Sequence, residues 1–240
     1  MLKNPHTPSM DKIKKIGILL TQTRSPTSKE KALWDRHGYT VHHQALLSVR
    51  LLPVKQLDVV PQAIVLTSVN GAQSLENSDW DRSIPVYGVG NATATAAKNV
   101  GFIKCTSPSD KPYPCALNLI NWIKNNLDPE DGVIVFGCGK HLRHDIAEEL
   151  SKFGFQMSKV VLYKTEPVAN FDAEIEQALK NRNIGSVSLN SEQAVKAFAS
   201  LCETKNIVFK DFHMFVSSEF LKKCTQQLGY VNISVVQQSP

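Results

Sequence analysis

AIVLTSVNGA, residues 63–72, decides the fold class of this chain. Its apolar start is a short hydrophobic run bounded by polar residues, which predicts a buried strand over residues 63–67. Ser68 to Gly71 then predicts a polar loop that opens a short helix. An apolar strand, a small polar loop and a helix in this order are typical of a parallel α/β sheet.

The same order repeats along the chain on both sides of this stretch. Apolar runs predict further strands, and helical patterns that often end at a glycine predict the helices between them. The strand–helix–strand order is that of an α/β protein with parallel sheets. The other predicted strands are 16–20, 39–47, 86–89, 132–136, 160–163, 186–189, 213–216 and 233–236, and the main predicted helices run through 32–34 and over 91–99, 117–127, 142–153, 171–180, 194–201 and 218–228.

Two extended segments divide the chain into lobes. Residues 48–55 contain Pro53 and residues 164–169 contain Pro167, and proline disfavours both a helix and a central strand. Two such crossings predict two similar parallel-sheet lobes joined by a two-stranded connector, with one lobe inserted into the other. The expected parts are a flexible leader over 1–11, a discontinuous first lobe over 12–47 plus 168–240, and a second lobe over 50–163.

The composition excludes several classes of protein. The chain has 240 residues, of which 42% are hydrophobic and 20% charged, as in ordinary globular proteins. No apolar run reaches the roughly 18 residues of a membrane span. The net charge of +5 comes without a long Lys/Arg block, which favours a small anionic ligand over a nucleic acid. Because no apolar segment lies near Met1, we expect no secretion signal and a cytoplasmic protein.

The spacing of cysteine and histidine argues against a metal site and a disulfide framework. The five cysteines are odd in number, far apart and without a Cys-x-x-Cys pair. His42 and His43 would point to opposite faces of a strand, so they cannot chelate one ion together. His141 and His144 are three apart at a helix start and could face the same way, but no third ligand is obvious apart from Asp145 or Cys138. We therefore expect no metal.

Small polar residues and glycines recur where a predicted strand ends and the next helix begins. In open α/β sheets these carboxyl ends of the strands form the ligand-binding edge, and helix starts attract carboxylates. Such side chains also cap helices, which is an alternative role for each of them, and the glycines allow either close backbone approach or only a tight turn. The candidates are Thr67, Ser68, Asn70, Gly90, Thr93, Gly139, Asn190, Ser191 and Ser218.

Short motifs stand in one fixed order along the chain. None is specific alone, because Thr-Ser before a helix and Gly-x-Gly are both common. Their joint order and spacing carry the information. The motifs are Thr23–Arg24, LTSVNGA (66–72), YGVGNATA (87–94), the series Gly139, Arg143, Ile146 and Leu150, VLYKT (161–165), and Asn190–Ser191 with Ala194, Val195 and Phe198.

In this order and spacing the motifs resemble those of the uroporphyrinogen-III synthase family over nearly all of the chain beyond residue 15. Two positions depart from the family pattern: Cys138 stands where arginine is often found, and Asn190 stands where threonine is usual. The resemblance implies a two-lobed α/β enzyme, a cyclising hydro-lyase that uses no cofactor.

The resemblance further implies hydroxymethylbilane, an open-chain polycarboxylated tetrapyrrole of heme biosynthesis, as the substrate. Its terminal hydroxyl would leave, its last ring would invert through a spiro intermediate, and closure would give uroporphyrinogen III. Tyr163 is the candidate for assisting the departure of the hydroxyl, with packing at the lobe junction as the alternative. Arg24 and Arg143 are candidates for binding carboxylates, with surface pairing as the alternative. We expect a monomer, with no membrane or nucleic-acid partner and at most a transient contact with the enzyme that forms hydroxymethylbilane.

Two other classes of protein fit part of the pattern. A non-enzymatic two-lobed protein could clamp a small anion with the same loops. A nucleotide-binding enzyme would use the Gly-Val-Gly turn at 88–90. However, Thr93 stands where that fingerprint needs a third glycine, and no acidic residue ends the next strand.

Overall fold

The computed structural model of the chain describes residues 16–108, 115–142 and 144–236. Two expectations from the sequence, the leader over residues 1–11 and the binding residue Arg143, lie outside the described residues. Within the described ranges, no helix is both long enough and apolar enough to cross a membrane.

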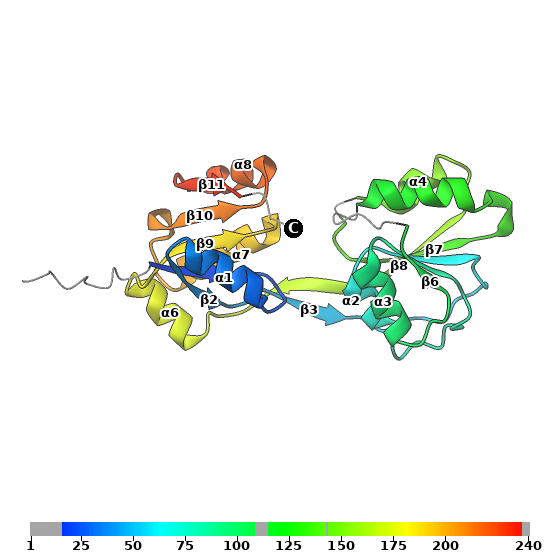
Figure 1. Cartoon of the computed structure of the whole chain (residues 1–240), viewed down its shortest axis with the longest axis horizontal. Helices are drawn as coiled ribbons and strands as arrows, with labels where there is room; N and C mark the ends of the chain where they lie inside the picture. The colour runs from blue at the N-terminus through cyan, green and yellow to red at the C-terminus, as the bar shows by residue number, and fades with distance from the viewer. Residues whose placement is uncertain (1–15, 109–114, 143, 237–240) are drawn as a thin grey trace, which may run out of the picture. The chain divides into compact units, whose positions relative to one another are not determined.

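The chain folds into two units, each with its own sheet (Figure 1). The described part of unit 1 is residues 16–47 and 167–236, and unit 2 is formed by residues 48–166, so unit 2 interrupts the sequence of unit 1. Both sheets are built mainly from parallel strands. The predicted fold class, a two-lobed α/β protein with parallel sheets, is confirmed.

Unit 1 holds a five-stranded sheet in the order β11-β10-β9-β1-β2, and every neighbouring pair is parallel. The first of the described strands therefore lies inside the sheet, with Ile18 opposite Val41 on one side and Ser186 on the other. The elements are β1 (Ile16–Leu20), α1 (Ser28–Arg36), β2 (Tyr39–His43), α6 (Ala173–Lys180), β9 (Ile184–Leu189), α7 (Glu192–Thr204), a 3-10 turn (Phe209–Asp211), β10 (His213–Val216), α8 (Glu219–Gln227) and β11 (Ile233–Val235).

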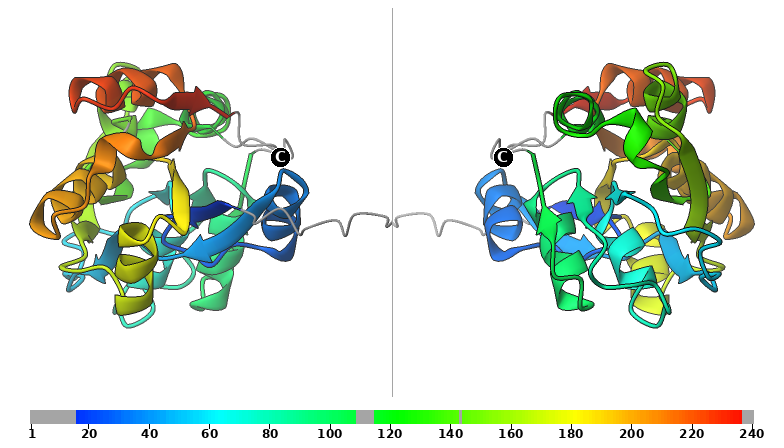
Figure 2. Two further views of the ribbon diagram at one scale, coloured as in Figure 1. Left: turned by 90° about the vertical axis from the view of Figure 1, so that its left-hand side faces the viewer. Right: turned by 90° about the vertical axis from the view of Figure 1, so that its right-hand side faces the viewer.

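The helices of unit 1 cover the two faces of its sheet unequally (Figure 2). Helices α6, α7 and α8 pack on one face, and α7 alone contributes a row of buried side chains that includes Val195 and Phe198. Helix α1 packs on the other face through Trp34, whose ring lies 5.0 Å from that of Phe215. No residue of α1 is buried. Apolar contact therefore holds α1 less firmly than α7.

Unit 2 holds a six-stranded sheet in the order β3-β8-β7-β4-β5-β6. Neighbouring strands from β8 to β6 are parallel. Strand β3 runs antiparallel to β8, because Leu52 N donates to Leu162 O while Ser48 Oγ donates to Glu166 O. The elements are β3 (Leu47–Leu51), β4 (Ala63–Leu66), α2 (Val69–Ser74), β5 (Val86–Gly88), α3 (Asn91–Asn99), β6 (Cys105–Thr106), α4 (Ala116–Asn126), a 3-10 turn (Pro129–Asp131), β7 (Ile134–Gly139), α5 (Ile146–Ser151) and β8 (Met157–Pro167).

The stretch that opens the sequence argument forms the centre of the unit 2 sheet. All four residues of β4 are buried, as expected for a strand covered on both faces. Ile64 and Leu66 pack with α2 and α3, whereas Val65 packs with α4 and α5. On the neighbouring strand, a Cβ at Gly137 would lie 2.6 Å from a methyl carbon of Leu162 and 2.7 Å from one of Leu66. Glycine stands there because apolar side chains from both sides fill the space.

The strand predicted over residues 39–47 is in fact divided between β2 and β3. Gln44 lies at the break and is buried. Its Nε2 donates to Asn170 O at 3.1 Å, and its Oε1 accepts from Asp172 N at 3.1 Å. These hydrogen bonds connect the break between β2 and β3 to a segment more than 120 residues further along the chain. The local pattern of apolar residues cannot predict such a contact.

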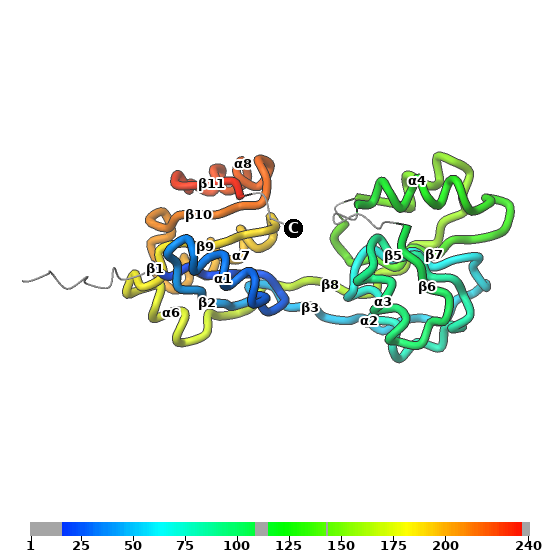
Figure 3. Tube along the Cα trace, viewed as in Figure 1, coloured from blue at the N-terminus to red at the C-terminus, as the bar shows by residue number. Residues whose placement is uncertain are grey.

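Two further elements differ in length from the prediction. The helix predicted over 142–153 is the shorter α5, because Asp145 caps it by accepting a hydrogen bond from Glu148 N. The strand predicted over 160–163 is part of the longer β8, which pairs with β7 on one side and β3 on the other. The chain leaves unit 1 through β3 and returns along β8 (Figure 3).

Candidate functional site

Unit 2 gathers small polar residues and glycines at one edge of its sheet. Strands β5, β4, β7 and β8 are parallel neighbours, so their carboxyl ends point to the same edge. Thr67 and Ser68 directly follow β4, and Ser68 Oγ caps α2 by accepting from Asn70 N at 3.1 Å. The predicted site residues that belong to this edge are Thr67, Ser68, Asn70, Gly90, Thr93, Gly139 and Tyr163.

Helix α3 begins directly after β5 and packs closely on the end of that strand. A Cβ at Gly88 would lie 2.7 Å from Ala94 N and 3.1 Å from Thr93 Cβ. Thr93 is only 4% exposed, so its side chain is used in packing and is not presented at the edge. Gly90 is the N-cap and makes no side-chain cap hydrogen bond. The first N–H groups of α3 therefore have no side-chain cap.

Tyr163 lies opposite Gly139 at the end of β7. The two residues are register partners, and Lys140 N donates to Tyr163 O at 2.9 Å. A Cβ on Gly139 would lie 2.8 Å from Cζ of the tyrosine ring and 3.0 Å from its hydroxyl oxygen. The half-buried phenol thus rests on the backbone of Gly139, and its ring also packs against the apolar cluster beneath α2 and α3. The structure brings these two predicted residues together.

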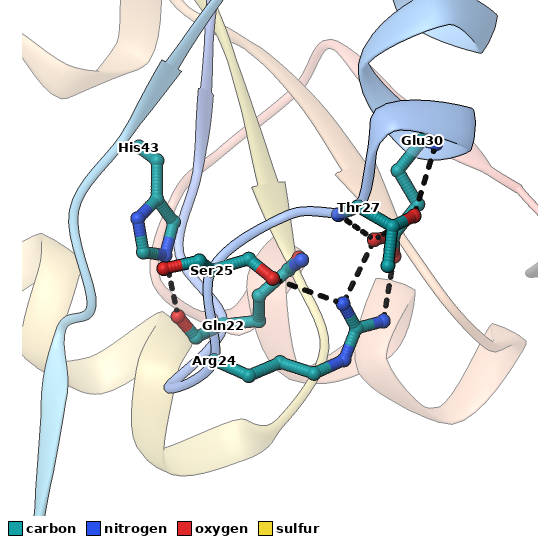
Figure 4. Close-up of polar contacts among 6 residues, drawn as sticks. All are labelled: Gln22, Arg24, Ser25, Thr27, Glu30 and His43. Atoms are coloured by element: carbon teal, nitrogen blue, oxygen red, sulfur yellow. Dashed lines mark hydrogen bonds and ion pairs between the residues drawn. The ribbon is translucent and has the colours of Figure 1, made fainter.

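Unit 1 presents Arg24 in the loop between β1 and α1 (Figure 4). Its guanidinium makes two parallel hydrogen bonds to the Glu30 carboxylate, from Nη1 to Oε2 at 2.8 Å and from Nη2 to Oε1 at 2.7 Å. Nη1 also donates to Ser25 O at 3.2 Å. The Arg24 side chain is 62% exposed. Arg24 is therefore paired but open to solvent.

Glu30 was not among the residues predicted from the sequence. It belongs to a capping box with Thr27, in which each residue accepts a backbone hydrogen bond from the other. The hydrogen bonds from Arg24, followed by those from Thr27, lower the pKa of the Glu30 carboxyl to about 2. The signal that could have revealed it is Thr27-Ser28-Lys29-Glu30, which follows the Ser/Thr-x-x-Glu pattern of a capped helix start.

The same loop region is tied to the sheet by two further contacts. Thr21 is buried, and its hydroxyl donates to Ser188 O at 2.6 Å. His43 Nε2 lies 2.9 Å from Gln22 O (Figure 4). These contacts fix Thr21 and Gln22, the two residues that directly follow β1, so the loop leaves β1 in a defined direction.

Ser191 and Ser218 cap the helices that follow β9 and β10. Ser191 Oγ accepts from Ala194 N at 3.1 Å, and Ser218 Oγ accepts from Leu221 N at 3.2 Å. Strands β1, β9 and β10 are parallel neighbours, so these serines, Asn190 and the Arg24 loop share the carboxyl edge of the unit 1 sheet. Capping, the alternative role for each serine, is therefore present, and it leaves other helix-start N–H groups able to meet a carboxylate.

The remaining surface features do not include the predicted residues. Among the described residues, no group of three or more His, Cys, Asp or Glu side chains is placed to hold a metal ion. One hollow in unit 1 is lined by residues between 202 and 210, and one in unit 2 chiefly by residues between 53 and 59 and by 158–161. No predicted site residue lines either hollow, and those within the described residues lie at or near the carboxyl edges of the strands.

Parallel strands followed by helices, with hydroxyl, amide and glycine residues at the carboxyl edges, define an α/β protein, and helix starts of this kind favour anionic ligands. A sequence model of the family described as uroporphyrinogen-III synthase HemD matches residues 29–238. The chain belongs to this family, whose members are cyclising lyases of tetrapyrrole biosynthesis. The resemblance and the enzyme class predicted from the sequence are confirmed, and the alternative of a non-enzymatic anion-binding protein has no support here.

Solved structures of the same family are similar to this chain. Uroporphyrinogen-III synthetase from Helicobacter pylori 26695 is 14% identical, with 92% of each chain covered and a TM-score of 0.66, which shows the shared fold. A mutant uroporphyrinogen III synthase from the extremely thermophilic bacterium Thermus thermophilus is 14% identical, with 94% of each chain covered and a TM-score of 0.48. No curated protein sequence matches the chain.

Proposed function

We propose that this chain converts hydroxymethylbilane to uroporphyrinogen III with release of one water molecule. The observation that carries the proposal is the family match over residues 29–238. The two carboxyl edges support it, because each supplies hydrogen-bond donors of the kind that bind the carboxylates of such a substrate. Holding the flexible chain is the larger part of the task, since closure without inversion gives the type I isomer.

The proposed chemistry begins with the bond between the terminal carbon and its hydroxyl oxygen. The electron pair of the adjacent pyrrole nitrogen drives this bond to break, and Tyr163 donates the proton with which the oxygen leaves as water. The resulting cation is attacked by the substituted carbon of the last ring, which gives the spiro intermediate. The bond from this carbon to its original bridging methylene then breaks, which leaves a cation on the neighbouring ring. The unsubstituted α-carbon of the last ring attacks that methylene and closes the macrocycle. One proton is lost as aromaticity returns, and the Tyr163 phenolate takes it back.

The proposed role of Tyr163 is supported by its place on Gly139, where the glycine leaves room for the phenol at the strand edge. Thr67, Ser68, Asn70, Gly90 and Gly139 on unit 2 are the proposed substrate contacts beside it. On unit 1 the proposed contacts are Arg24, Asn190, Ser191 and Ser218, each at the carboxyl edge of its sheet. We leave out Thr93 because it is buried.

We also propose that the enzyme works as a monomer in the cytoplasm without a cofactor, and meets the enzyme that forms its substrate only transiently. All five cysteines are free thiols in the structure, which suits a reducing compartment. Gel filtration tests whether the enzyme is a monomer, and cell fractionation tests whether it lies in the cytoplasm.

The decisive experiment supplies hydroxymethylbilane made in place by its upstream enzyme, and then separates type I from type III uroporphyrin after oxidation. We expect type III to dominate when the chain is present and type I when it is absent. Type I alone in the presence of folded protein would overturn the proposed function.

A further inference from the structure

We propose that Glu30 is a positioning residue, which holds the guanidinium of Arg24 so that its unused edge meets a substrate carboxylate. This inference rests on the proposed function, because it assigns a second residue to the carboxylate-binding role proposed for Arg24. It is carried by the geometry of the loop between β1 and α1 (Figure 4).

Glu30 is itself fixed by the start of α1. Its Oε2 accepts from Thr27 N at 2.7 Å and lies 2.9 Å from Thr27 Oγ1, while Glu30 N donates to Thr27 Oγ1 at 3.2 Å. Thr27 is the N-cap of the helix, so the carboxylate is anchored to the backbone at the point where the helix begins. Glu30 thus offers Arg24 an acceptor in one defined place.

Arg24 uses only part of its planar fork on this anchor. Both Nη atoms bond the two carboxylate oxygens of Glu30, and Nη1 also bonds Ser25 O. Among the residues that the structure describes, none accepts a hydrogen bond from Nε. A guanidinium has five N–H donors, and the edge formed by Nε and one Nη is a second bidentate site for a carboxylate.

Two opposing effects follow from this pairing. The negative charge of Glu30, ionised because its pKa is about 2, offsets part of the attraction of Arg24 for another carboxylate. Against this, Arg24 is 62% exposed, and an exposed arginine without an anchor would have to be ordered during binding. Since solvent screens charge effects at such an exposed site, we expect the gain from a preset guanidinium to be the larger effect.

The test uses Glu30→Gln, because glutamine still completes a capping box but removes the ion pair with Arg24. We expect KM for type III formation to rise about 5- to 10-fold with kcat within about 2-fold, the order of effect for ordering one long side chain. Arg24→Gln should raise KM at least as much. In the Arg24→Gln background, Glu30→Gln should change KM by less than about 2-fold, since the two residues act as one unit.

The control is Glu176→Gln, which removes a carboxylate from the first turn of α6 in the same unit. Glu176 also has a lowered pKa, but it pairs with Lys180 and Lys205 and contacts none of the proposed site residues. Its KM should match that of the wild type. Thermal unfolding of every variant checks that the fold is intact.

Three results would overturn the inference. An unchanged KM in Glu30→Gln would show that Arg24 needs no anchor, and a lower KM would show that Glu30 competes with the substrate. The same rise in KM in the Arg24→Gln background would show that Glu30 acts apart from Arg24. If the wild type forms only type I product, both the proposed function and this inference are wrong. If the wild type forms type III product, the proposed function stands and the variants test the role of Glu30 alone.

Discussion

The ring of Tyr163 packs against the backbone of Gly139 at the end of β7. Because of this contact, the hydroxyl can be tested separately from the ring. The ring stays packed when only the hydroxyl is removed, because its carbons contact Gly139 and the apolar cluster. We therefore expect Tyr163→Phe to lower kcat by roughly 10²-fold or more, the usual contribution of a general acid, with little change in the unfolding midpoint.

The matched control is Tyr87→Phe. Tyr87 is another half-buried tyrosine of unit 2, on β5, where burial raises the pKa of its phenol and its ring lies 4.6 Å from that of Trp122. Its turnover should stay near that of the wild type. Equal turnover in Tyr163→Phe and the wild type would remove Tyr163 from the proposed mechanism.

The contacts between the candidate site residues were harder to predict than the candidates themselves. The candidates Tyr163 and Gly139 were visible in the sequence, but their contact depends on the register between β7 and β8, which shifts at Cys138/Gly139. In the sequence, Thr93 resembles the other hydroxyl donors. In the structure it is buried, because Gly88 has no side chain and α3 packs closely on the end of β5. These are contacts between segments, which spacing along the chain does not encode.

At the scale of single elements, α1 and α7 begin with the same kind of cap but differ in what holds them afterwards. Thr27 caps α1, which has no buried residue, and Ser191 caps α7, which is rich in buried residues. Loss of either cap should cost about 1 kcal/mol locally. Only in α1 is little apolar packing left to compensate.

We therefore expect Thr27→Ala to speed hydrogen exchange of the α1 amides about 5-fold, which corresponds to that local cost. Ser191→Ala should leave the middle of α7 protected as in the wild type. Mass-spectrometric exchange of both variants measures the two helices at once. Equal loss of protection in both helices would contradict the view that packing alone distinguishes them.

Elements with strong apolar runs were predicted well, and the errors fall where a distant contact intervenes. The strand predicted over 63–67 differs from β4 by only one residue. Its four consecutive buried apolar residues are typical of a strand covered on both faces, which made it easy to predict. The strand over 39–47 was wrong because Gln44 bonds to the segment around Asn170 and Asp172. The short β6 was missed, since two residues carry no periodicity.

At the scale of the whole molecule, the two units differ in how their sequence is laid out. Unit 2 is one continuous segment, residues 48–166, with its own apolar clusters on both faces of its sheet. We expect this segment alone to fold and to unfold cooperatively, as a domain with its own core should. Circular dichroism during thermal and urea unfolding measures this.

The second half of unit 1, residues 167–236, is the matching negative control. It contains β9, β10 and β11 but lacks β1 and β2, which complete the sheet beside β9. It should remain unfolded under the same conditions. A segment 48–166 that shows no cooperative transition would contradict the domain boundaries that we propose.

The place of β1 has a consequence for synthesis on the ribosome. Thr21, at the end of β1, bonds to Ser188, which lies 167 residues further along the chain. At about 5–20 residues per second, the apolar strand β1 waits roughly ten to thirty seconds for β9, the partner beside which it is buried. During that time the nascent chain exposes Ile-Gly-Ile-Leu-Leu to its surroundings. Residues 48–166 are synthesised before that partner, so unit 2 has time to fold while β1 still lacks its neighbour β9.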